Sequence, residues 1–448
     1  MQGFKKNIKK YLKQTDYYQG KKETEFYQKR RMLLSRLEED EKAARYAHVY
    51  FKGNKTEEYV NLLNQIIITL RPKARYQSWI DTGLYFSRLY AMTDNVPPNY
   101  DIILNNSIDG LKQLCEGKNS DLSNNIITFL DAVLIYLDRI IEKVDQFLSF
   151  SHTDSCGERM LKTKEYFLNM KTEKCQCLEE AFQRILFWSD LFWQSQHRLV
   201  GIGRLDKLLV NYTLPDNYGE IIHDFYLEMH RYFAYKSNGM LLGDTGQIIE
   251  LGGLEPDGSY YCNEYTFKFI EILKEQPIPE PKLLLRVSKN MPDTLLELAL
   301  VCIATGVGCP LLSNDEVVIP ALKSFGYKHD DACNYVTSAC WEPLAYGKSL
   351  EKNNMSCINY GKCFEKTYSD SCFESRKTFQ DICELFLTKV DSECARVIGV
   401  VDATVWEEDP LSSLFTDPCL QSGKDISEGG AQYNNYGVLS VGMANAVD

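Results

Sequence analysis

One short segment of the sequence places two reactive side-chain types close together. Cys340 and Glu342 are two residues apart, and Pro343 follows the glutamate. A proline disfavours the helical conformation for the residue before it, so Glu342 is expected to be extended. In an extended segment, residues i and i+2 project to the same side. The thiol and the carboxylate are therefore predicted to share one cavity.

A thiol beside a carboxylate suits radical chemistry better than nucleophilic catalysis. A nucleophilic cysteine needs a stabilised thiolate, whereas a neighbouring carboxylate disfavours a second negative charge. A neutral thiol that gives up a hydrogen atom has no such requirement, and the carboxylate can then serve separately as a base. The alternative is that Cys340 is a small buried hydrophobic residue and Glu342 makes only local hydrogen bonds. The motif by itself leaves this alternative open.

Further motifs resemble glycyl radical enzymes of the pyruvate formate-lyase superfamily. Cys340-Trp-Glu-Pro is similar to the Gly-Cys-x-Glu-Pro thiyl loop of the eliminases and decarboxylases in that group, with Ala339 in place of the usual glycine. The resemblance extends over residues 178–448, and the chain before them is similar only in being a helical N-terminal region. Other segments that follow the family's pattern, in its order, are residues 199–206, 251–253, 286–287, 311–316 and 423–434.

The resemblance implies an α/β fold that forms part of a ten-stranded β/α barrel. The chain would supply the first half-barrel and part of the second. Residues 1–235 are expected to be a large, mainly helical N-terminal region, and residues 236–448 are expected to be the barrel region that carries the thiyl loop. A C-terminal glycyl radical domain is expected to be absent.

The resemblance also implies roles for individual residues. Cys340 would carry the thiyl radical, and Glu342 would act as general base or proton acceptor. The implied reaction is radical elimination (a dehydratase or a C–N, C–S or C–O lyase) or decarboxylation of a small polar substrate. Pyruvate formate-lyase itself carries adjacent cysteines at this loop, so acyl transfer is disfavoured here. Because they lie near the loop, Tyr335, Thr337 and Tyr346 are candidate substrate-binding residues.

The radical glycine of the family is not found in its expected place. Its loop reads approximately Arg-Val-Ser/Ala-Gly-Tyr, and nothing after Asn434 supplies it. The near match around Gly399 lacks the tyrosine and lies before the Gly429-Gly430 segment instead of after it. The radical is therefore expected from a missing C-terminal segment or from a separate glycyl-radical-domain protein. The implied partners are a radical SAM iron–sulfur activating enzyme and, as a further option, a second copy of the chain.

A second function class stays open because the radical glycine is missing. In this alternative, the chain is a catalytically inactive, truncated homologue that acts as a binding or partner protein. A cysteine hydrolase is disfavoured, because no base accompanies Cys340.

Composition narrows the possible partners and compartments. The net charge of −12 opposes nucleic-acid binding, which needs a concentrated basic surface. No apolar run reaches the roughly 18 residues of a membrane span, and no secretory signal begins the sequence. The 15 cysteines therefore suggest reduced thiols in an anaerobic cytoplasm. No bound cofactor and no metal are expected, because the cysteine pairs 175/177 and 357/363 lack zinc-type or iron–sulfur spacing.

Periodicity predicts the elements that position these residues. Helices are expected from Ser123 or Asn124 to residue 148, over residues 178–193, and from Asp293 to about Gly306. Buried strands are expected at residues 283–287 and 397–401. Arg204 and Asp206 are expected to form a structural ion pair, and His197, His223 and His230 are expected to be structural.

Overall fold

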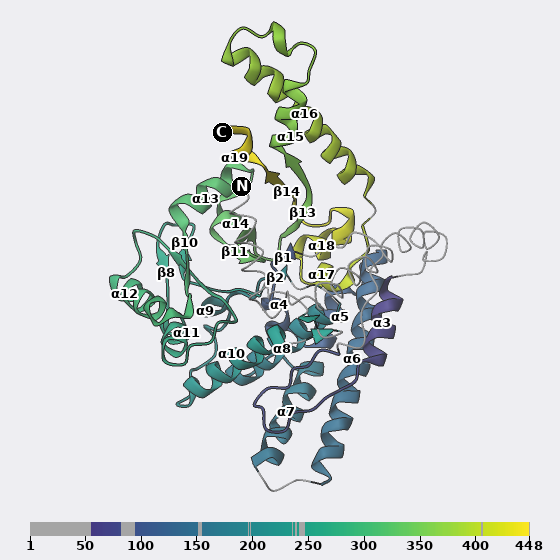
Figure 1. Ribbon diagram of the computed structural model, residues 1–448. Coiled ribbons are helices and arrows are strands. Elements are labelled where there is room, and N and C mark those ends of the chain that lie inside the picture. Colours follow the sequence, from purple (N-terminus) through teal and green to yellow (C-terminus); the bar gives the residue numbers. More distant parts are fainter. Residues whose placement is uncertain are drawn as a thin grey trace, which may run out of the picture. The chain divides into compact units, whose positions relative to one another are not determined.

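The N-terminal part of the structure is a set of helices packed around α6 (Asp121–Leu148) and α8 (Leu178–Gln194) (Figure 1). The structure is a computed structural model, and it describes residues 55–81, 95–150, 155–195, 197, 199–234, 236–237, 240–241, 247–404 and 406–447. Residues Lys55–Asp448 form one compact unit. The predicted boundary near residue 235 coincides with the end of α10 (Tyr218–Ala234), but the two-region division stays a prediction.

The long helix α6 follows the predicted periodicity but begins earlier. Its N-cap is Ser120, whose hydroxyl accepts a hydrogen bond from the Ser123 amide, so the helix starts at Asp121. The predicted start at Ser123 or Asn124 was wrong by one turn, because Ser120 satisfies the free amides first. The buried face of α6 packs against the helices α3 (Lys55–Gln65), α5 (Ile108–Cys115), α7 (Ser155–Thr172) and α17 (Pro410–Leu414).

Helix α8 has the predicted extent but is buried on nearly all sides. The ion pair between Glu180 and Arg184 is 2.6 Å long and completely enclosed. Arg184 also donates to the carbonyl groups of Ile103 and Glu173, which satisfies its charge inside the core. The Glu180–Arg184 pair of α8 therefore lies in the core, where Arg184 forms hydrogen bonds to other segments, instead of facing solvent. Its neighbours are α4 (Asp101–Asn105), α7 and α10.

A four-stranded parallel sheet follows in the second part of the chain, in the order β10-β9-β6-β3. The strand predicted at residues 283–287 is confirmed as β9. Parallel neighbours require crossover connections, which helices provide here. The predicted helix from Asp293 is confirmed as α12, which continues through a π-helical turn at Ile303–Val307. The strands are β3 (Gly203–Arg204), β6 (Ile249–Leu251), β9 (Leu283–Val287) and β10 (Leu311–Asn314), and the crossover helices are α11 (Glu264–Glu275) and α12 (Asp293–Cys302).

A second four-stranded sheet has the order β14-β13-β1-β2. Its two long strands, β13 and β14, are parallel, and the segment between them contains α15 to α18. The members are β1 (Asn95–Val96), β2 (Leu199–Val200), β13 (Ser349–Asn359) and β14 (Tyr433–Val441), and the helices are α15 (Tyr360–Tyr368), α16 (Phe379–Ala403), α17 and α18 (Asp417–Ser422).

Shorter elements complete the described part. Three two-stranded pairs are β4 (Lys236–Ser237) with β5 (Met240–Leu241), β7 (Gly253–Leu254) with β8 (Tyr260–Tyr261), and β11 (Tyr335–Ser338) with β12 (Glu342–Ala345). The remaining helices are α9 (Leu205–Leu208), α13 (Asp315–Ser324), α14 (His329–Cys333), α19 (Met443–Val447) and the 3-10 turns Phe373–Ser375 and Ile426–Glu428.

The strand predicted at residues 397–401 was wrong. These residues lie inside the 25-residue helix α16, which begins with a capping box between Thr378 and Asp381. Val397 packs in a small cluster with Ile358 of β13 and Cys363 of α15. The local preference of β-branched residues for strands is therefore overridden by the capped helix and its packing. Gly399 also lies within this helix.

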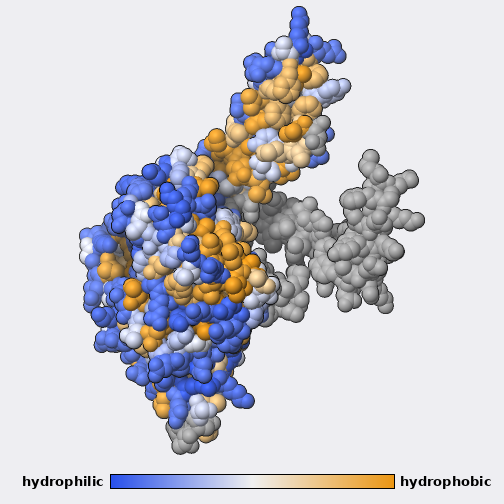
Figure 2. Space-filling model, turned by 90° about the vertical axis from the view of Figure 1, so that its left-hand side faces the viewer, coloured by the Kyte–Doolittle hydropathy of each residue, from blue (hydrophilic) through white to orange (hydrophobic). Residues whose placement is uncertain are grey.

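Apolar side chains remain exposed around β14 and α16. Figure 2 shows hydrophobic residues gathered on the part of the surface at the top of the view, where α15 and α16 lie. Within the described sheet, β14 is an edge strand that pairs only with β13. Exposed large apolar residues of these elements and of α19 include Phe364, Phe379, Leu387, Ile398, Tyr436, Val438, Leu439 and Met443. Contiguous exposed apolar surface of this kind is typical of an interaction site.

Candidate active site

Cys340 lies at the tip of a β-hairpin, which we call the cysteine hairpin and define as residues Tyr335–Ala345. Its strands β11 and β12 are antiparallel, with Ser338 opposite Glu342, and the turn between them is Ala339-Cys340-Trp341. Glu342 is extended, as predicted. Cys340 is exposed and belongs to the turn, so the prediction that both residues lie in one extended segment was wrong. The chain therefore reverses its direction within the three-residue turn that contains Cys340.

The Glu342 carboxylate turns back toward the hairpin tip. Its Oε2 accepts a 2.8 Å hydrogen bond from the Trp341 amide, which joins Glu342 to the residue that follows Cys340. Thiol and carboxylate are thus joined through one tight turn, not along one side of a strand. The shared cavity for the two groups stays a prediction.

The backbone of the turn gives a physical reason for glycine in the related motif. Ala339 has a φ of 51°, and it is the one non-glycine residue with positive φ among the described residues. The left-handed conformation costs an L-residue about 1–2 kcal/mol, because its Cβ comes too close to the backbone. The chain therefore holds a strained residue directly before Cys340.

We expect Ala339→Gly to stabilise the protein slightly. The substitution relieves the left-handed strain but adds freedom to the unfolded chain, so the free energy of unfolding should rise by up to about 1 kcal/mol. Ala345→Gly is the matched control in strand β12, where the alanine is buried. That control should lose about 1 kcal/mol or more. Urea unfolding of both variants is the measurement, and a loss of stability in Ala339→Gly would contradict the strain argument.

A buried charge cluster holds strand β11. Arg286 of β9 donates through Nη1 to the carbonyl oxygens of Cys333 at 3.0 Å and Tyr335 at 3.2 Å. Its Nε and Nη2 form a bidentate pair with the Asp315 carboxylate, both at 2.9 Å. Glu250 of β6 accepts a 2.6 Å hydrogen bond from the Thr337 amide. Charged residues of the parallel sheet therefore fix two backbone groups of β11, at Tyr335 and Thr337, and the carbonyl of Cys333 at the end of α14 just before it.

The hairpin also approaches the segment before β3 closely. The Ser338 hydroxyl accepts from the Gly201 amide at 3.0 Å and is placed to donate to the Leu199 carbonyl at 3.1 Å. A Cβ at Gly201 would lie 2.5 Å from the Thr337 carbonyl oxygen, which is too close for any side chain. This contact explains why the chain has glycine at position 201.

The three candidate substrate-binding residues have different surroundings. The Tyr335 hydroxyl is buried and donates to Asp315 at 2.8 Å, within the charge cluster. Tyr346 accepts a 3.3 Å hydrogen bond from the Asp101 amide through its hydroxyl oxygen. The Thr337 hydroxyl is buried and has no hydrogen-bond partner within the described part of the chain. A substrate-binding role for any of the three stays a prediction.

Other predicted pairings are rearranged in the structure. Arg204 pairs with Glu255 at 2.9 Å, and Asp206 instead accepts from the Gly252 amide at 2.7 Å. The expected pair between Arg204 and Asp206 was therefore wrong, because β3 passes directly into α9 and directs the two side chains to different segments. His197 is buried against Asp409 at 2.5 Å, which agrees with a structural role.

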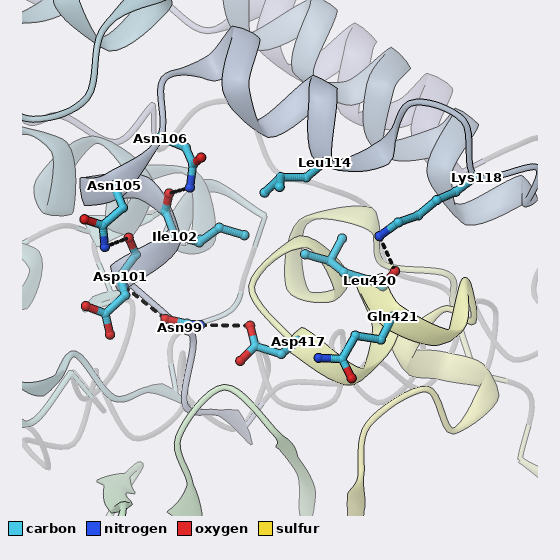
Figure 3. Close-up of a pocket in the computed structure, with 10 residues that line it drawn as sticks. All are labelled: Asn99, Asp101, Ile102, Asn105, Asn106, Leu114, Lys118, Asp417, Leu420 and Gln421. Carbon is cyan, nitrogen blue, oxygen red and sulfur yellow. Dashed lines mark hydrogen bonds between the residues drawn. The ribbon is translucent and has the colours of Figure 1, made fainter.

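A pocket lies between the segment around Asn99 and helix α18 (Figure 3). Its volume is about 340 Å³, and α4, α5 and α18 contribute its walls. Asn99 donates to Asp417 at 2.8 Å across the pocket floor, and Gly347, just after β12, donates to the Pro97 carbonyl at 2.8 Å. Burial raises the pKa of Asp417. The lining residues are Asn99, Asp101, Ile102, Asn105, Asn106, Leu114, Lys118, Asp417, Leu420 and Gln421.

Sequence reasoning missed both the charge cluster and this pocket. The pocket residues come from chain segments around positions 99–118 and 417–421, which only the fold brings together. No group of His, Cys, Asp and Glu residues that could hold a metal ion occurs in the described part of the chain. None of the described helices is long and apolar enough to cross a membrane.

Solved structures of glycyl radical enzymes share this fold. The glycerol-bound B12-independent glycerol dehydratase from Clostridium butyricum matches 89% of this chain and 53% of its own, with a TM-score of 0.69 and 20% identity. Hydroxyproline dehydratase from Clostridioides difficile, with trans-4-hydroxy-L-proline bound, matches 87% of this chain and 55% of its own, with a TM-score of 0.67 and 20% identity. The predicted fold class, part of a glycyl radical enzyme barrel, is confirmed.

The chain belongs to the pyruvate formate lyase-like family, whose model matches residues 14–448. The probable dehydratase YbiW of Escherichia coli (strain K12) is 25% identical over 402 residues, which are 78% of this chain and 49% of that protein. The (2S)-3-sulfopropanediol dehydratase of Klebsiella oxytoca is 23% identical over 392 residues, which are 78% of this chain and 47% of that protein. The chain thus spans about half the length of these curated relatives.

Proposed function

We propose that this chain is the cysteine-bearing part of a glycyl radical lyase that acts by radical elimination or decarboxylation. The observation that carries the proposal is Cys340, at the exposed tip of a hairpin anchored by buried charges, with Glu342 bonded to the same turn. Membership of the family supports this assignment. The relatives act as dehydratases, sulfite-lyases and a decarboxylase.

The proposed chemistry uses Cys340 as a reversible hydrogen-atom carrier. A glycyl radical takes the hydrogen atom of the Cys340 thiol, and the resulting thiyl takes a hydrogen atom from a substrate carbon. Glu342 accepts a proton from the substrate radical while a neighbouring group leaves, or carbon dioxide is lost. The product radical then recovers a hydrogen atom from the Cys340 thiol. A carboxylate near the thiol serves this sequence, because transfer of a hydrogen atom does not require a thiolate and leaves the carboxylate available as a base.

The substrate class we propose is a small hydroxylated or otherwise polar molecule. Relatives act on sulfopropanediol, trans-4-hydroxy-L-proline and isethionate according to their names. The buried Thr337 hydroxyl, three residues before Cys340, is the candidate that best fits a polar substrate, because a buried hydroxyl without a partner costs free energy until a ligand bonds to it. Tyr335 and Tyr346 are weaker candidates, since each hydroxyl already has a partner.

We propose that the radical glycine reaches Cys340 from polypeptide corresponding to the half of the relatives that this chain does not match. The exposed edge of β14 and the apolar side chains of α16 are the surfaces we assign to that polypeptide. An unpaired strand edge offers backbone donors and acceptors to an added strand. A radical SAM activating enzyme would generate the glycyl radical. All 15 cysteines are free thiols, which supports an oxygen-free, reducing cytoplasm.

The decisive experiment is anaerobic reconstitution. The chain is mixed with a radical SAM activase, S-adenosylmethionine and candidate radical-domain polypeptides that match the remaining half of the relatives. We expect a glycyl EPR signal and release of an elimination or decarboxylation product from one of glycerol, trans-4-hydroxy-L-proline, isethionate, sulfopropanediol or 4-hydroxyphenylacetate. A glycyl signal without product from any substrate would favour the alternative, a catalytically silent binding or partner protein.

A further inference from the structure

The buried carboxylate of Glu250 connects the parallel sheet to the cysteine hairpin. Glu250 is completely buried on β6, and its Oε2 accepts the 2.6 Å hydrogen bond from the Thr337 amide of β11. The two strands belong to different sheets, so this bond is a tertiary contact and not part of a strand ladder. Thr337 is three residues from Cys340, which makes Glu250 the nearest of the charged anchors to the turn.

Charged and titratable groups face Glu250 from several elements. Arg286 of β9 places Nε 3.8 Å from Glu250 Oε1, and Arg204 of β3 is its register neighbour in the sheet. Asp315 of α13 and Tyr335 of β11 complete the cluster around Arg286. Burial raises the pKa of Glu250 to about 7, although Arg286 acts in the opposite direction. The carboxylate therefore changes protonation state close to neutral pH.

We propose that Glu250 is a positioning residue for Cys340, and that its ionised carboxylate holds the cysteine hairpin through the Thr337 amide. A two-stranded hairpin is only marginally stable by itself, so its position depends on such anchors. A hydrogen bond to an ionised acceptor is roughly twice as strong as one between neutral groups. Protonation of Glu250 then loosens the hairpin and displaces its tip. The inference rests on the proposed function only for the importance of Cys340.

The position of the hairpin tip can be measured without any turnover. Trp341 follows Cys340 directly and is 42% exposed, so its indole reports on the turn. We would replace tryptophan with 5-fluorotryptophan, record 19F NMR spectra between about pH 6 and pH 8, and assign the Trp341 resonance with Trp341→Phe. We expect this resonance to move with a midpoint near pH 7 in the unsubstituted protein.

The variant Glu250→Gln separates the charge of Glu250 from its size. Glutamine keeps a carbonyl acceptor for the Thr337 amide but is always neutral. Its Trp341 resonance should therefore lose the pH-dependent movement and stay near the position that the unsubstituted protein shows at low pH. Such a loss of a pH profile is not expected of a residue that only fills space in the core.

Two control variants distinguish Glu250 from its neighbours. Glu255→Gln removes a carboxylate that pairs with Arg204 and Lys207, and it should leave the transition unchanged. His329→Gln tests a histidine whose ring lies 3.8 Å from Cys333 Sγ, close to the start of β11, and it should also leave the transition unchanged.

Three results would overturn the inference: a Trp341 resonance that does not move in the unsubstituted protein, a transition that persists in Glu250→Gln, or a transition that disappears in His329→Gln. The first of these needs only the assignment variant Trp341→Phe, so the test stands even if Glu250→Gln does not fold. An absent lyase activity leaves all these spectra interpretable, which separates this inference from the proposed function.

Discussion

Replacing Cys340 with alanine is expected to abolish product formation by the reconstituted complex. Alanine has no hydrogen atom that can pass to a glycyl radical, so the substrate radical cannot form. Turnover should fall by on the order of 10⁴-fold or more, the scale seen when a reacting side chain is removed. Product release measured by mass spectrometry under anaerobic conditions is the test. The glycyl EPR signal should remain, because activation of the glycine does not pass through Cys340.

The matched control is Cys372→Ala, which removes another exposed cysteine from a turn outside the hairpin. That variant should keep both the radical and the turnover of the unsubstituted chain. Equal loss of activity in both variants would point to general thiol damage, and full activity of Cys340→Ala would rule out the proposed role. The comparison thus tests the one residue on which the proposed chemistry depends.

The cysteine motif was readable from the sequence because its parts are neighbours in the chain. Pro343 correctly predicted an extended Glu342, whereas the turn at Cys340 follows from the positive φ of Ala339 and the pairing of Ser338 with Glu342. A sequence with alanine at 339 gives no sign of that conformation. The mistaken extended segment is therefore a failure to recognise a turn that lacks the usual glycine.

The anchors of the hairpin could not be predicted in the same way. Glu250 and Arg286 lie on different strands and reach β11 only after the sheet has formed. Arg286 follows a buried apolar run and lies in one of the segments that resemble the family, but its hydrogen-bond partners are far away in the sequence. Similarly, periodicity located α8 but not its enclosed Glu180–Arg184 pair. Local sequence patterns predict helices and strands. The partners of buried charged residues depend on tertiary contacts, which these patterns do not predict.

Helix α16 shows a different kind of error, in which a local strand-like composition led to the wrong prediction of a strand. The residues around Val397 have strand-like composition, but the helix begins at a capping box near Thr378 and continues through them. Few of its side chains are buried, so the amphipathic pattern that identifies most helices is weak here. If α16 is covered by a partner polypeptide, as we propose, its burial pattern is completed only in the assembly.

Arg286→Met is expected to cost about 3–5 kcal/mol in the free energy of unfolding, because it leaves buried charges without a counter-charge. The arginine is completely buried, forms the bidentate pair with Asp315, and lies with its guanidinium 4.0 Å from the centre of the Tyr335 ring. Methionine fills similar space but pairs with neither Asp315 nor Glu250, and it leaves the carbonyl groups of Cys333 and Tyr335 without their hydrogen bonds from the guanidinium. Urea unfolding followed by fluorescence measures the loss.

Lys207→Met is the control for removing a positive charge. Lys207 is 41% exposed and pairs with Glu255 at 2.8 Å, so its loss should cost less than about 1 kcal/mol. If Arg286→Met costs no more than Lys207→Met, the buried cluster is not what anchors the hairpin strand.

The pH dependence of the Arg286→Met variant adds a second check. Without Arg286, burial acts on Glu250 with less opposition, so the pKa of this carboxyl in the folded state rises further above that of the unfolded chain. A carboxyl with a raised pKa destabilises the fold as the pH increases, because the folded state then binds more protons than the unfolded state. The penalty of Arg286→Met should therefore be larger at about pH 8 than at about pH 5. A penalty that does not depend on pH would mean that lost packing, not uncompensated charge, is the cause.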